Sequence, residues 1–153
     1  MNKSKIVALL LEKLRDDFES RSRVSKMTRE SGNDSESKAE SKYDTLAIEE
    51  NYLADGLARQ ALAAAEAMAE IQEMPIRPFA ANEPMDLGAL VELDFGDTTE
   101  WFFLAPSCGG TEISLDHKVV TVITPESPLG SQLIGRLVGD QTTRPSARIV
   151  GTA

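Results

Sequence analysis

Two long segments without proline occupy the first half of the chain, and helices are the structure that such segments most readily form. Residues 2–30 contain neither glycine nor proline, and their apolar side chains recur about every 3.5 residues, which predicts a single helix. A second stretch, which has Gly56 but no proline, runs over residues 35–73 and also predicts a helix. Between them, residues 31–34 predict a turn, because Gly32 and Asn33 tolerate the left-handed conformation that ends a helix. We therefore expect an antiparallel helical hairpin.

The apolar stripes of the two helices predict which side chains meet at their seam. In the first helix they are Val7, Leu10, Leu11, Leu14, Phe18, Val24 and Met27. In the second they are Tyr43, Leu46, Leu53, Leu57, Ala64, Met68 and Ile71. Stripes this narrow are typical of a two-helix coiled coil rather than of helices in a globular core. On this pattern alone, a spacer, a dimerisation seam or an adaptor hairpin is an equally good interpretation.

From Gly88 onward the apolar residues alternate with polar ones, as they do in strands. The sequence therefore predicts a compact α+β unit with an antiparallel sheet and one short helix. Ser127 and Pro128 are suited to begin that helix, as N-cap and first helical residue, and Gly135 to end it. The expected division is a hairpin over 1–74, a linker over 75–87 and a sheet domain over 88–153. The expected strands cover residues 89–95, 101–104, 111–115, 118–123 and 148–150.

Composition excludes several classes of function. Cys108 is the only cysteine, so no disulfide can form within the chain, and with His117 as the only histidine a Cys/His zinc site lacks ligands. No apolar run approaches the ~20 residues of a membrane span. The N-terminus does not resemble a signal peptide. We expect a cytoplasmic protein with no membrane partner.

The charge of the chain is strongly polarised along the hairpin. The whole sequence has a formal net charge of −9, which argues against free binding to nucleic acid. Residues 1–31 carry a net charge of +3, whereas residues 32–73 carry −7. The two predicted helices are therefore opposite in sign.

The most specific motif is a Ser-Pro turn, then a short helix ending in Leu-Ile-Gly, then a Val-Gly-Asp turn. It comprises residues 122–130, 133–135 and 138–140. These residues resemble the C-terminal domain of the GreA/GreB family of bacterial transcription elongation factors, with Arg136 where that family usually has lysine. The order of hairpin, linker and small sheet domain agrees with this family.

The second predicted helix adds to the resemblance. Tyr43 is followed nine residues later by Tyr52 and Leu53, with Gly56 soon after, and this spacing looks like the family's second hairpin helix. The resemblance implies an FKBP-like sheet domain that docks on RNA polymerase at the rim of its secondary channel. By position, the contacts would come from Glu126, Ser127 and Pro128.

The resemblance also implies a role for the hairpin, which would enter the channel with an acidic tip. The tip candidates are Asp34, Glu36 and Glu40, which would hold Mg²⁺ shared with the polymerase and stimulate its own two-metal cleavage of backtracked transcripts. The chain would then be a monomeric accessory factor, not an enzyme. It would need no cofactor in isolation, and it would meet nascent RNA only inside the polymerase complex.

The predicted tip departs from the family pattern. Aligned on Tyr43 and Tyr52, the family's second acidic residue falls on Ala39, one residue before Glu40. An offset of one residue rotates a helical side chain by about 100°. A non-cleaving regulator or inhibitor in the same channel is therefore the alternative. Acidic residues near a helix start also interact favourably with the helix dipole without binding a metal.

Four basic residues near the end of the first helix allow two interpretations. Contact with the transcript 3′ end would be phosphate-directed, while the simpler interpretation is a favourable interaction with the negative end of the helix. The residues are Arg21, Arg23, Lys26 and Arg29.

An enzyme of a different class is the remaining alternative, because an FKBP-like domain could be a peptidyl-prolyl isomerase. Fold alone does not decide this question. Such an enzyme needs an aromatic-lined pocket, and Trp101, Phe102 and Phe103 are predicted to lie in the core instead. The aromatic residues available to this half are Phe79, Phe95, Trp101, Phe102 and Phe103.

Overall fold

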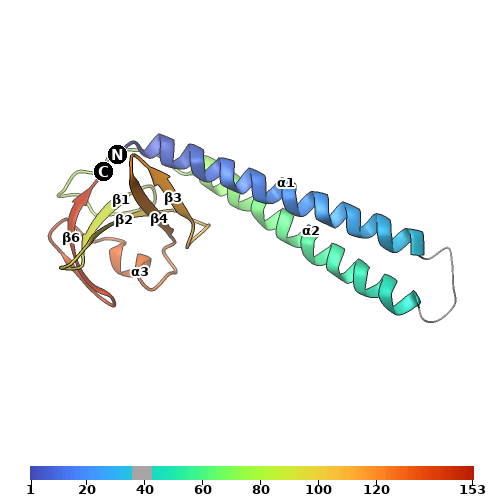
Figure 1. Ribbon diagram of the computed structural model, residues 1–153. Helices are drawn as coiled ribbons and strands as arrows, with labels where there is room; N and C mark the ends of the chain where they lie inside the picture. The colour runs from blue at the N-terminus through green and yellow to red at the C-terminus, as the bar shows by residue number, and fades with distance from the viewer. Residues whose placement is uncertain (36–42) are drawn as a thin grey trace. The chain divides into compact units, whose positions relative to one another are not determined.

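The computed structural model describes residues 1–35 and 43–153, which form two long helices and a six-stranded sheet with one short helix (Figure 1). This arrangement confirms the predicted α+β fold class. Within these residues, no helix combines the length and apolar character needed to cross a membrane. The elements are α1 (Lys3–Ser35), α2 (Tyr43–Glu73), β1 (Leu90–Asp94), β2 (Thr99–Leu104), β3 (Glu112–Leu115), β4 (Lys118–Ile123), α3 (Gly130–Leu133), β5 (Gln141–Thr143) and β6 (Ser146–Thr152).

Helix α1 continues beyond the turn that was expected at residues 31–34. It passes through Gly32 and Asn33 and ends at Ser35, so the predicted position of the turn is wrong. One glycine costs a helix about 1 kcal/mol relative to alanine, which weakens the helix but does not end it. Residues 36–42 lie outside the described part of the chain.

The side chains between α1 and α2 differ from the predicted stripes. Val24 and Met27 are 45% and 61% exposed, and Leu53 is 57% exposed, so the prediction is wrong at these positions. Other stripe positions, among them Leu10 and Ile71, are buried as predicted. Small residues make the close contact of the two helices within residues 12–68, because they let the backbones approach. The buried residues there are Ser25, Ala54 and Ala61.

The sheet has the strand order β3-β4-β2-β1-β6-β5 and is mixed. Strands β2 and β4 are parallel, with Phe103 opposite Val122, whereas the other four pairs are antiparallel. The expected antiparallel sheet is therefore wrong at this one pair. The reason is topological: β3 lies between β2 and β4 in the chain and reverses its direction, so that β4 runs the same way as β2. Strand β5 was not predicted, since its three residues show no readable period.

The turn between β3 and β4 falls on the two residues between the predicted strands 111–115 and 118–123. Asp116 and His117 both have positive φ, at 52° and 61°, which is the backbone of a two-residue type I′ hairpin turn. The short helix α3 starts later and ends earlier than predicted, at Gly130 and Leu133. Gly135 follows with φ of 77°, the left-handed conformation expected just beyond a helix end.

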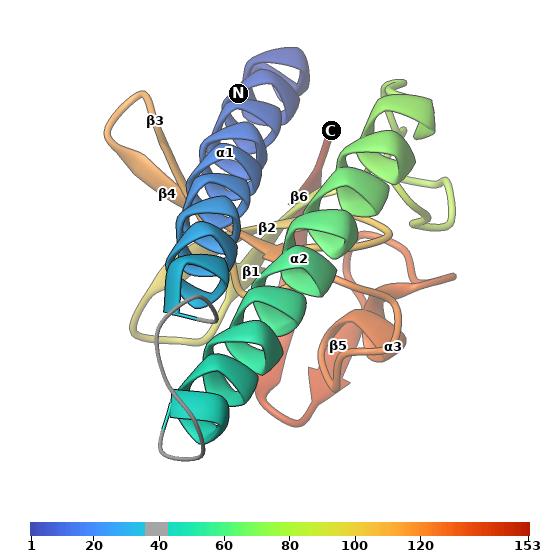
Figure 2. The same ribbon diagram turned by 90° about the vertical axis from the view of Figure 1, so that its right-hand side faces the viewer.

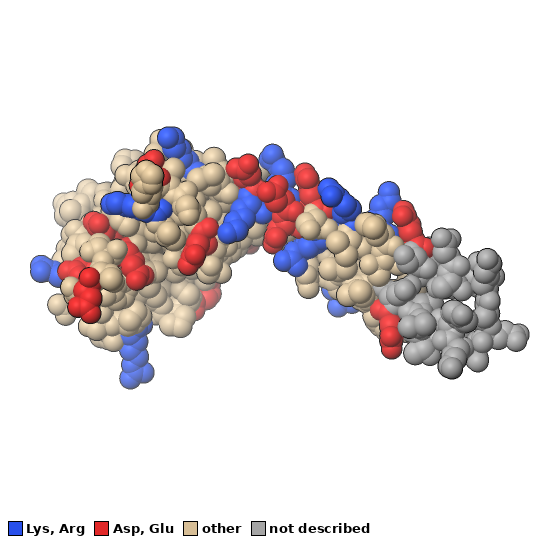
Figure 3. Space-filling model, in the orientation of Figure 1, with Lys and Arg blue, Asp and Glu red and all other residues tan. Residues whose placement is uncertain are grey.

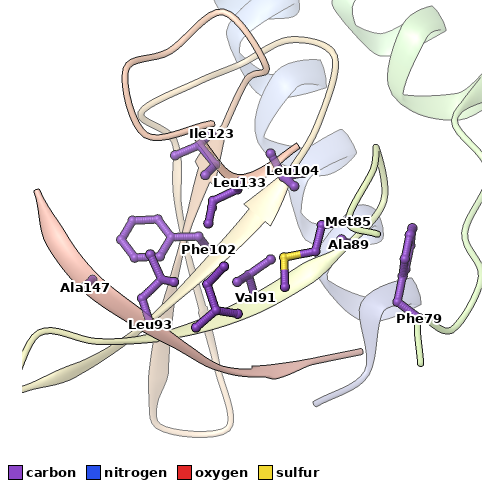
Figure 4. Close-up of a cluster of buried hydrophobic side chains, with 11 residues drawn as sticks. Phe79, Met85, Ala89, Val91, Leu93, Phe102, Leu104, Ile123, Leu133 and Ala147 are labelled. Atoms are coloured by element: carbon purple, nitrogen blue, oxygen red, sulfur yellow. The ribbon is translucent and has the colours of Figure 1, made fainter. Parts of the chain in front are cut away.

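One face of the sheet packs into the main hydrophobic core (Figure 4). The alternation of the strands directs Val91 and Leu93 of β1 to this face, where Phe102 lies opposite Val91 and Ile149 lies opposite Leu93. Leu133 of α3 closes the core and is fully buried. The remaining members are Phe79, Met85, Ala89, Leu104, Ile123 and Ala147.

The opposite face of the sheet is also buried over part of its area. Leu90, Phe103 and Val122 form a row across three strands and are fully buried. Met1–Leu11 and Ala69–Ala153 form one compact unit, so both ends of the helical hairpin belong with the sheet. Ile6, Leu10, Ile71 and Met74 are buried and belong to this unit. Glu12–Met68 form the second compact unit.

The segment expected to be a linker, residues 75–87, is joined to the sheet unit by buried side chains. Phe79 and Met85 are 5% and 1% exposed and belong to the hydrophobic core. Arg77 stacks on the Phe79 ring at 4.0 Å, and Lys3 lies 5.0 Å from the same ring. The lack of period over these residues marks an irregular segment, but one that is packed.

Candidate functional site

The predicted docking residues lie in a tight turn, which we call the docking turn and define as residues 124–130. Ser127 is its internal brace: its hydroxyl donates to the Thr124 carbonyl at 2.7 Å and accepts from the Gly130 N–H at 3.0 Å. The Ser127 backbone N–H also donates to the Thr124 carbonyl, at 3.0 Å. The hydroxyl accepts from the N–H three residues ahead, as an N-cap side chain does, but the N-cap of α3 is Leu129 and the helix begins at Gly130, so the prediction of Ser127 as N-cap and Pro128 as first helical residue is wrong.

The packing of Gly130 explains why the docking turn is so tight. A Cβ at this position would lie 2.0 Å from the Thr124 carbonyl oxygen and 2.8 Å from Ser127 Oγ. Only glycine allows the chain to pass here. The residues left facing outward are Glu126 and Pro128, which are both exposed, whereas Ser127 is half-buried. The turn therefore presents a carboxylate and a proline ring on a braced backbone.

Gln132 of α3 ties the docking turn to the connection between β5 and β6. Its side-chain amide nitrogen donates to the carbonyls of Pro128 at 2.8 Å and Arg144 at 2.7 Å. Its amide oxygen accepts from the Thr143 N–H at 2.7 Å and the Arg144 N–H at 3.3 Å. Figure 2 shows α3 beside β5, the pair of elements that this side chain connects. The side-chain amide nitrogen thus donates one hydrogen bond to Pro128 and one to Arg144, so Gln132 helps to hold Pro128 in place.

The four basic residues of α1 are not equivalent. Arg29 forms an ion pair with Asp55 at 2.8 Å, and Arg21 pairs with Asp17 at 3.2 Å and also donates to Gln60. The contacts of residues 21 and 29 with residues 60 and 55 also show that α1 and α2 run antiparallel in Glu12–Met68. All of these side chains are at least partly exposed, so the pairs add little stability.

The other two basic residues, Arg23 and Lys26, form no ion pair within the described residues, and both are exposed. Figure 3 shows acidic and basic side chains interspersed along the helices. Of the four predicted transcript contacts, these two are therefore the ones whose charge is not already paired.

The predicted acidic tip falls largely outside the described residues. Glu36 and Glu40 lie within residues 36–42, and Asp34 belongs to the last turn of α1. No group of three or more His, Cys, Asp or Glu side chains that could hold a metal occurs in the part of the chain that the structure describes. The Mg²⁺ prediction for these three residues remains a prediction from sequence.

The aromatic residues of the sheet unit do not line a pocket together. Phe79, Phe102 and Phe103 are at most 7% exposed and lie in the interior. Phe95 packs edge-on against Phe102, with ring centroids 6.3 Å apart. Trp101 is half-buried and has Lys118 over its ring. Trp101 lines a cleft with charged residues, whereas Phe79, Phe102 and Phe103 are interior, so these five side chains do not form one aromatic-walled pocket.

Two residues of the site were not singled out from the sequence. The sequence marks Gly130 only as part of a motif, because its role depends on how closely the Thr124 carbonyl approaches in the folded chain. Gln132 had no signal of its own, because its partners Thr143 and Arg144 are 11 and 12 residues away in the chain.

No family model matches the chain, and no curated protein matches it. Two solved structures are similar to it over nearly its whole length. The crystal structure of the GreA factor homolog 1 (Gfh1) protein of Thermus thermophilus has 17% sequence identity and a TM-score of 0.36, covering 97% of this chain and 93% of that chain. The crystal structure of Thermus aquaticus Gfh1 has 16% identity and a TM-score of 0.35, covering 97% and 92%. Similarity at this level does not assign the chain to a family.

Proposed function

We propose that this protein binds bacterial RNA polymerase as a Gre-type transcription factor and acts through the secondary channel. The observation that carries the proposal is the docking turn, in which Glu126 and Pro128 are exposed on a backbone braced by Ser127 and Gln132. A preformed turn loses little conformational entropy on binding, which favours specific docking. The sequence motif that this turn belongs to resembles the polymerase-docking motif of the GreA/GreB family.

The helical hairpin supplies the second half of the proposal. Its helices pack antiparallel, so Asp34 at the end of α1, and Glu36 and Glu40 in the segment between α1 and α2, belong to one end of the hairpin in the sequence. We propose that these carboxylates share Mg²⁺ with the polymerase, which would supply the Lewis acid for transcript cleavage. Arg23 and Lys26 are proposed to contact transcript phosphates. The protein itself would carry out no chemistry.

A non-cleaving regulator of the same channel is the second proposal, and one specific observation favours it. In the alignment with the family, Ala39 falls where the second acidic residue of the tip is expected. The nearest carboxylate, that of Glu40, lies one residue further along the chain. Both proposals require the same docking turn and differ only at the tip. The isomerase alternative has less support, because Phe79, Phe102 and Phe103 are interior residues.

A binding experiment tests the docking turn. Immobilised RNA polymerase is incubated with the full chain and with a Glu126→Ala/Pro128→Ala variant, and the dissociation constants are compared. We expect the variant to bind roughly tenfold or more weakly, since two central contacts are lost. Asp97→Ala is the matched control, because Asp97 is also an exposed acidic turn residue but lies between β1 and β2. Equal binding by the wild type and the double variant would remove the docking proposal.

A second binding variant separates contact from positioning. Gln132→Ala keeps Glu126 and Pro128 in the sequence but removes the hydrogen bonds to Pro128 and Arg144. We expect weaker binding than wild type with an unchanged circular dichroism spectrum. Gln132→Glu keeps the size of the side chain but replaces its donating amide with a carboxylate, so it should bind as weakly as the alanine variant.

A cleavage experiment decides between the two tip proposals. A backtracked elongation complex is incubated with the wild-type chain and with a Glu36→Ala/Glu40→Ala variant that still binds polymerase. Faster cleavage by the wild type, lost in the variant, supports the Mg²⁺ proposal. Slower cleavage or slower elongation with the wild type supports the regulator. Stimulation that is unchanged in the variant would exclude these two carboxylates as the metal ligands.

A further inference from the structure

A cleft of about 460 Å³ lies beside Trp101 on the sheet, well away from the docking turn. We call it the Trp101 cleft and define it by Glu92, Glu100, Trp101, His117 and Lys118, which are among its lining residues. Its volume is in the range of pockets that hold small ligands or single side chains. All of these residues belong to the unit formed by Met1–Leu11 and Ala69–Ala153.

The strand register explains how the cleft is built. Glu92 of β1 lies directly opposite Trp101 of β2, so both side chains stand on the same face of the sheet. Val120 of β4 also lies opposite Trp101, and Lys118, two residues earlier, therefore points to that face as well. An aromatic ring is thus flanked by a carboxylate on one neighbouring strand and a cation on the other.

The chain itself shows that the Trp101 ring accepts a cation. Lys118 Nζ lies 4.9 Å from the ring centroid, within the distance of a cation–π interaction. Lys118 is exposed, and no ion pair holds it among the residues that the structure describes. The interaction of an exposed lysine with a ring is weak, so another cation can displace it.

Glu92 supplies the carboxylate on the face of the Trp101 ring, and it has no ion-pair partner within the described residues. Glu100 lies opposite Leu93, so its side chain stands on the other face of the sheet. A Cβ on Gly151 would lie 3.1 Å from Glu92 Oε2, so the glycine leaves the space that this carboxylate occupies. A cationic ligand that displaces Lys118 would gain both the ring and the Glu92 carboxylate.

We propose that the Trp101 cleft binds an arginine side chain presented by a basic segment of a partner protein. A planar guanidinium can stack on the indole ring and form paired hydrogen bonds with a carboxylate, which a lysine ammonium cannot do. Lys118 is then a built-in competitor that occupies the ring until the arginine replaces it. The proposal is independent of polymerase docking, since Lys118 begins β4 and the docking turn follows its other end, roughly 20 Å away for a strand of this length.

The single tryptophan of the chain makes the proposal directly measurable. The full-length protein is titrated with a short peptide containing one arginine, and with the same peptide containing citrulline, while Trp101 fluorescence is recorded. Citrulline has nearly the same shape as arginine but no charge. We expect a saturable change with the arginine peptide, with a dissociation constant on the order of 1 mM for such a small ligand, and none with citrulline.

Three variants test the assigned roles. Lys118→Ala removes the competitor and should tighten arginine binding roughly threefold, an effect that loss of folding cannot produce. Glu92→Gln should weaken it roughly threefold or more. Asp86→Asn is the matched control, because it also removes an exposed acidic charge but lies outside the cleft. Equal responses to arginine and citrulline, or unchanged binding by Lys118→Ala, would overturn the proposal.

Discussion

At the scale of single residues, Gly130 places the strictest steric demand on the docking turn. A Cβ there would lie 2.0 Å from the carbonyl oxygen of Thr124, which belongs to the backbone and cannot rotate away. We expect Gly130→Ala to lower the free energy of unfolding by about 3 kcal/mol, as strained packing in a buried site does. Urea unfolding followed by circular dichroism measures this loss.

Gly56 supplies the opposite case in the same chain. It lies inside α2, and no atom outside the local helix comes within 4 Å of the position of a Cβ. Alanine there adds no clash and restricts the unfolded chain, so Gly56→Ala should raise the free energy of unfolding by about 1 kcal/mol. Gly130→Ala and Gly56→Ala are thus expected to change the free energy of unfolding in opposite directions. Losses of similar size at both positions would contradict the packing described for Gly130.

Glu83 makes part of the stability depend on pH. Its carboxylate accepts a hydrogen bond from Arg77, the main reason that its pKa lies below the ordinary value of 4.5, and the Ala80 N–H adds to the effect. A carboxyl group with a lowered pKa stabilises the folded state above its unfolded pKa and loses that effect as the pH falls through the folded pKa. The contribution of Glu83 should therefore be complete at neutral pH and disappear in acid.

The Glu83→Gln variant isolates this effect. Unfolding by urea is measured for the wild type and the variant at neutral pH and at a pH well below 4.5. The wild type should be more stable than the variant at neutral pH, and the difference should shrink in acid, because glutamine does not titrate. A difference that is constant across this range would show that the Arg77 contact contributes nothing that depends on charge.

At the scale of elements, the seam of the helical hairpin provides a test on two adjacent residues. Ala54 is fully buried and its carbonyl accepts the Ser25 hydroxyl at 2.8 Å, whereas Leu53 is 57% exposed. Ala54→Leu should therefore destabilise the hairpin by about 2 kcal/mol, because the larger side chain forces the helices apart. Leu53→Ala should change stability by less than about 0.5 kcal/mol. Thermal unfolding, followed by the helical circular dichroism signal, compares the stabilities of the two variants. A larger loss of stability in Leu53→Ala than in Ala54→Leu would mean that Leu53, and not Ala54, lies in the seam.

The same seam shows why part of the hairpin could not be predicted. Apolar periodicity predicts both helices. It also predicts the buried residues near the start of α1 and the end of α2, such as Leu10 and Ile71. Further along, the seam consists of Ser25, Ala54 and Ala61, and small residues contribute almost no signal to an apolar pattern. The end of α1 differs from the prediction for a related reason: Gly32 favours a break in the sequence pattern, but the helix accommodates it.

In the sheet unit, predictions succeeded where the determinants are local. The Asp116–His117 turn depends on adjacent residues and is present, and the Ser127 hydroxyl contacts the N–H three residues ahead, although the N-cap of α3 is Leu129. The parallel pairing of β2 with β4 and the Gln132 contacts depend on how distant segments come together, and one sequence carries no such information. For this reason the docking turn could be located from its motif, but not the side chain that supports it.

At the scale of the whole molecule, the division into units does not follow the boundaries of the helices. Met1–Leu11 and the residues from Ala69 onward form one unit with the sheet, and this unit contains the hydrophobic core and the docking turn. Glu12–Met68 form the other unit, which carries Arg23, Lys26 and the proposed tip. The proposed binding to polymerase and the proposed effect on the transcript are therefore assigned to different units.

This division predicts the behaviour of a shortened chain in which Glu12–Met68 are replaced by a short Gly/Ser linker. Ile6, Leu10, Ile71 and Met74, which are buried within the sheet unit, all remain, so the shortened chain should unfold cooperatively. It should bind RNA polymerase within about tenfold of the full chain, a difference of less than 1.4 kcal/mol. It should have no effect on cleavage of a backtracked transcript, and it should compete with the full chain for the polymerase. A folded shortened chain that fails to compete would place the binding energy in the helices, whereas an unfolded one would show that the sheet unit depends on Glu12–Met68.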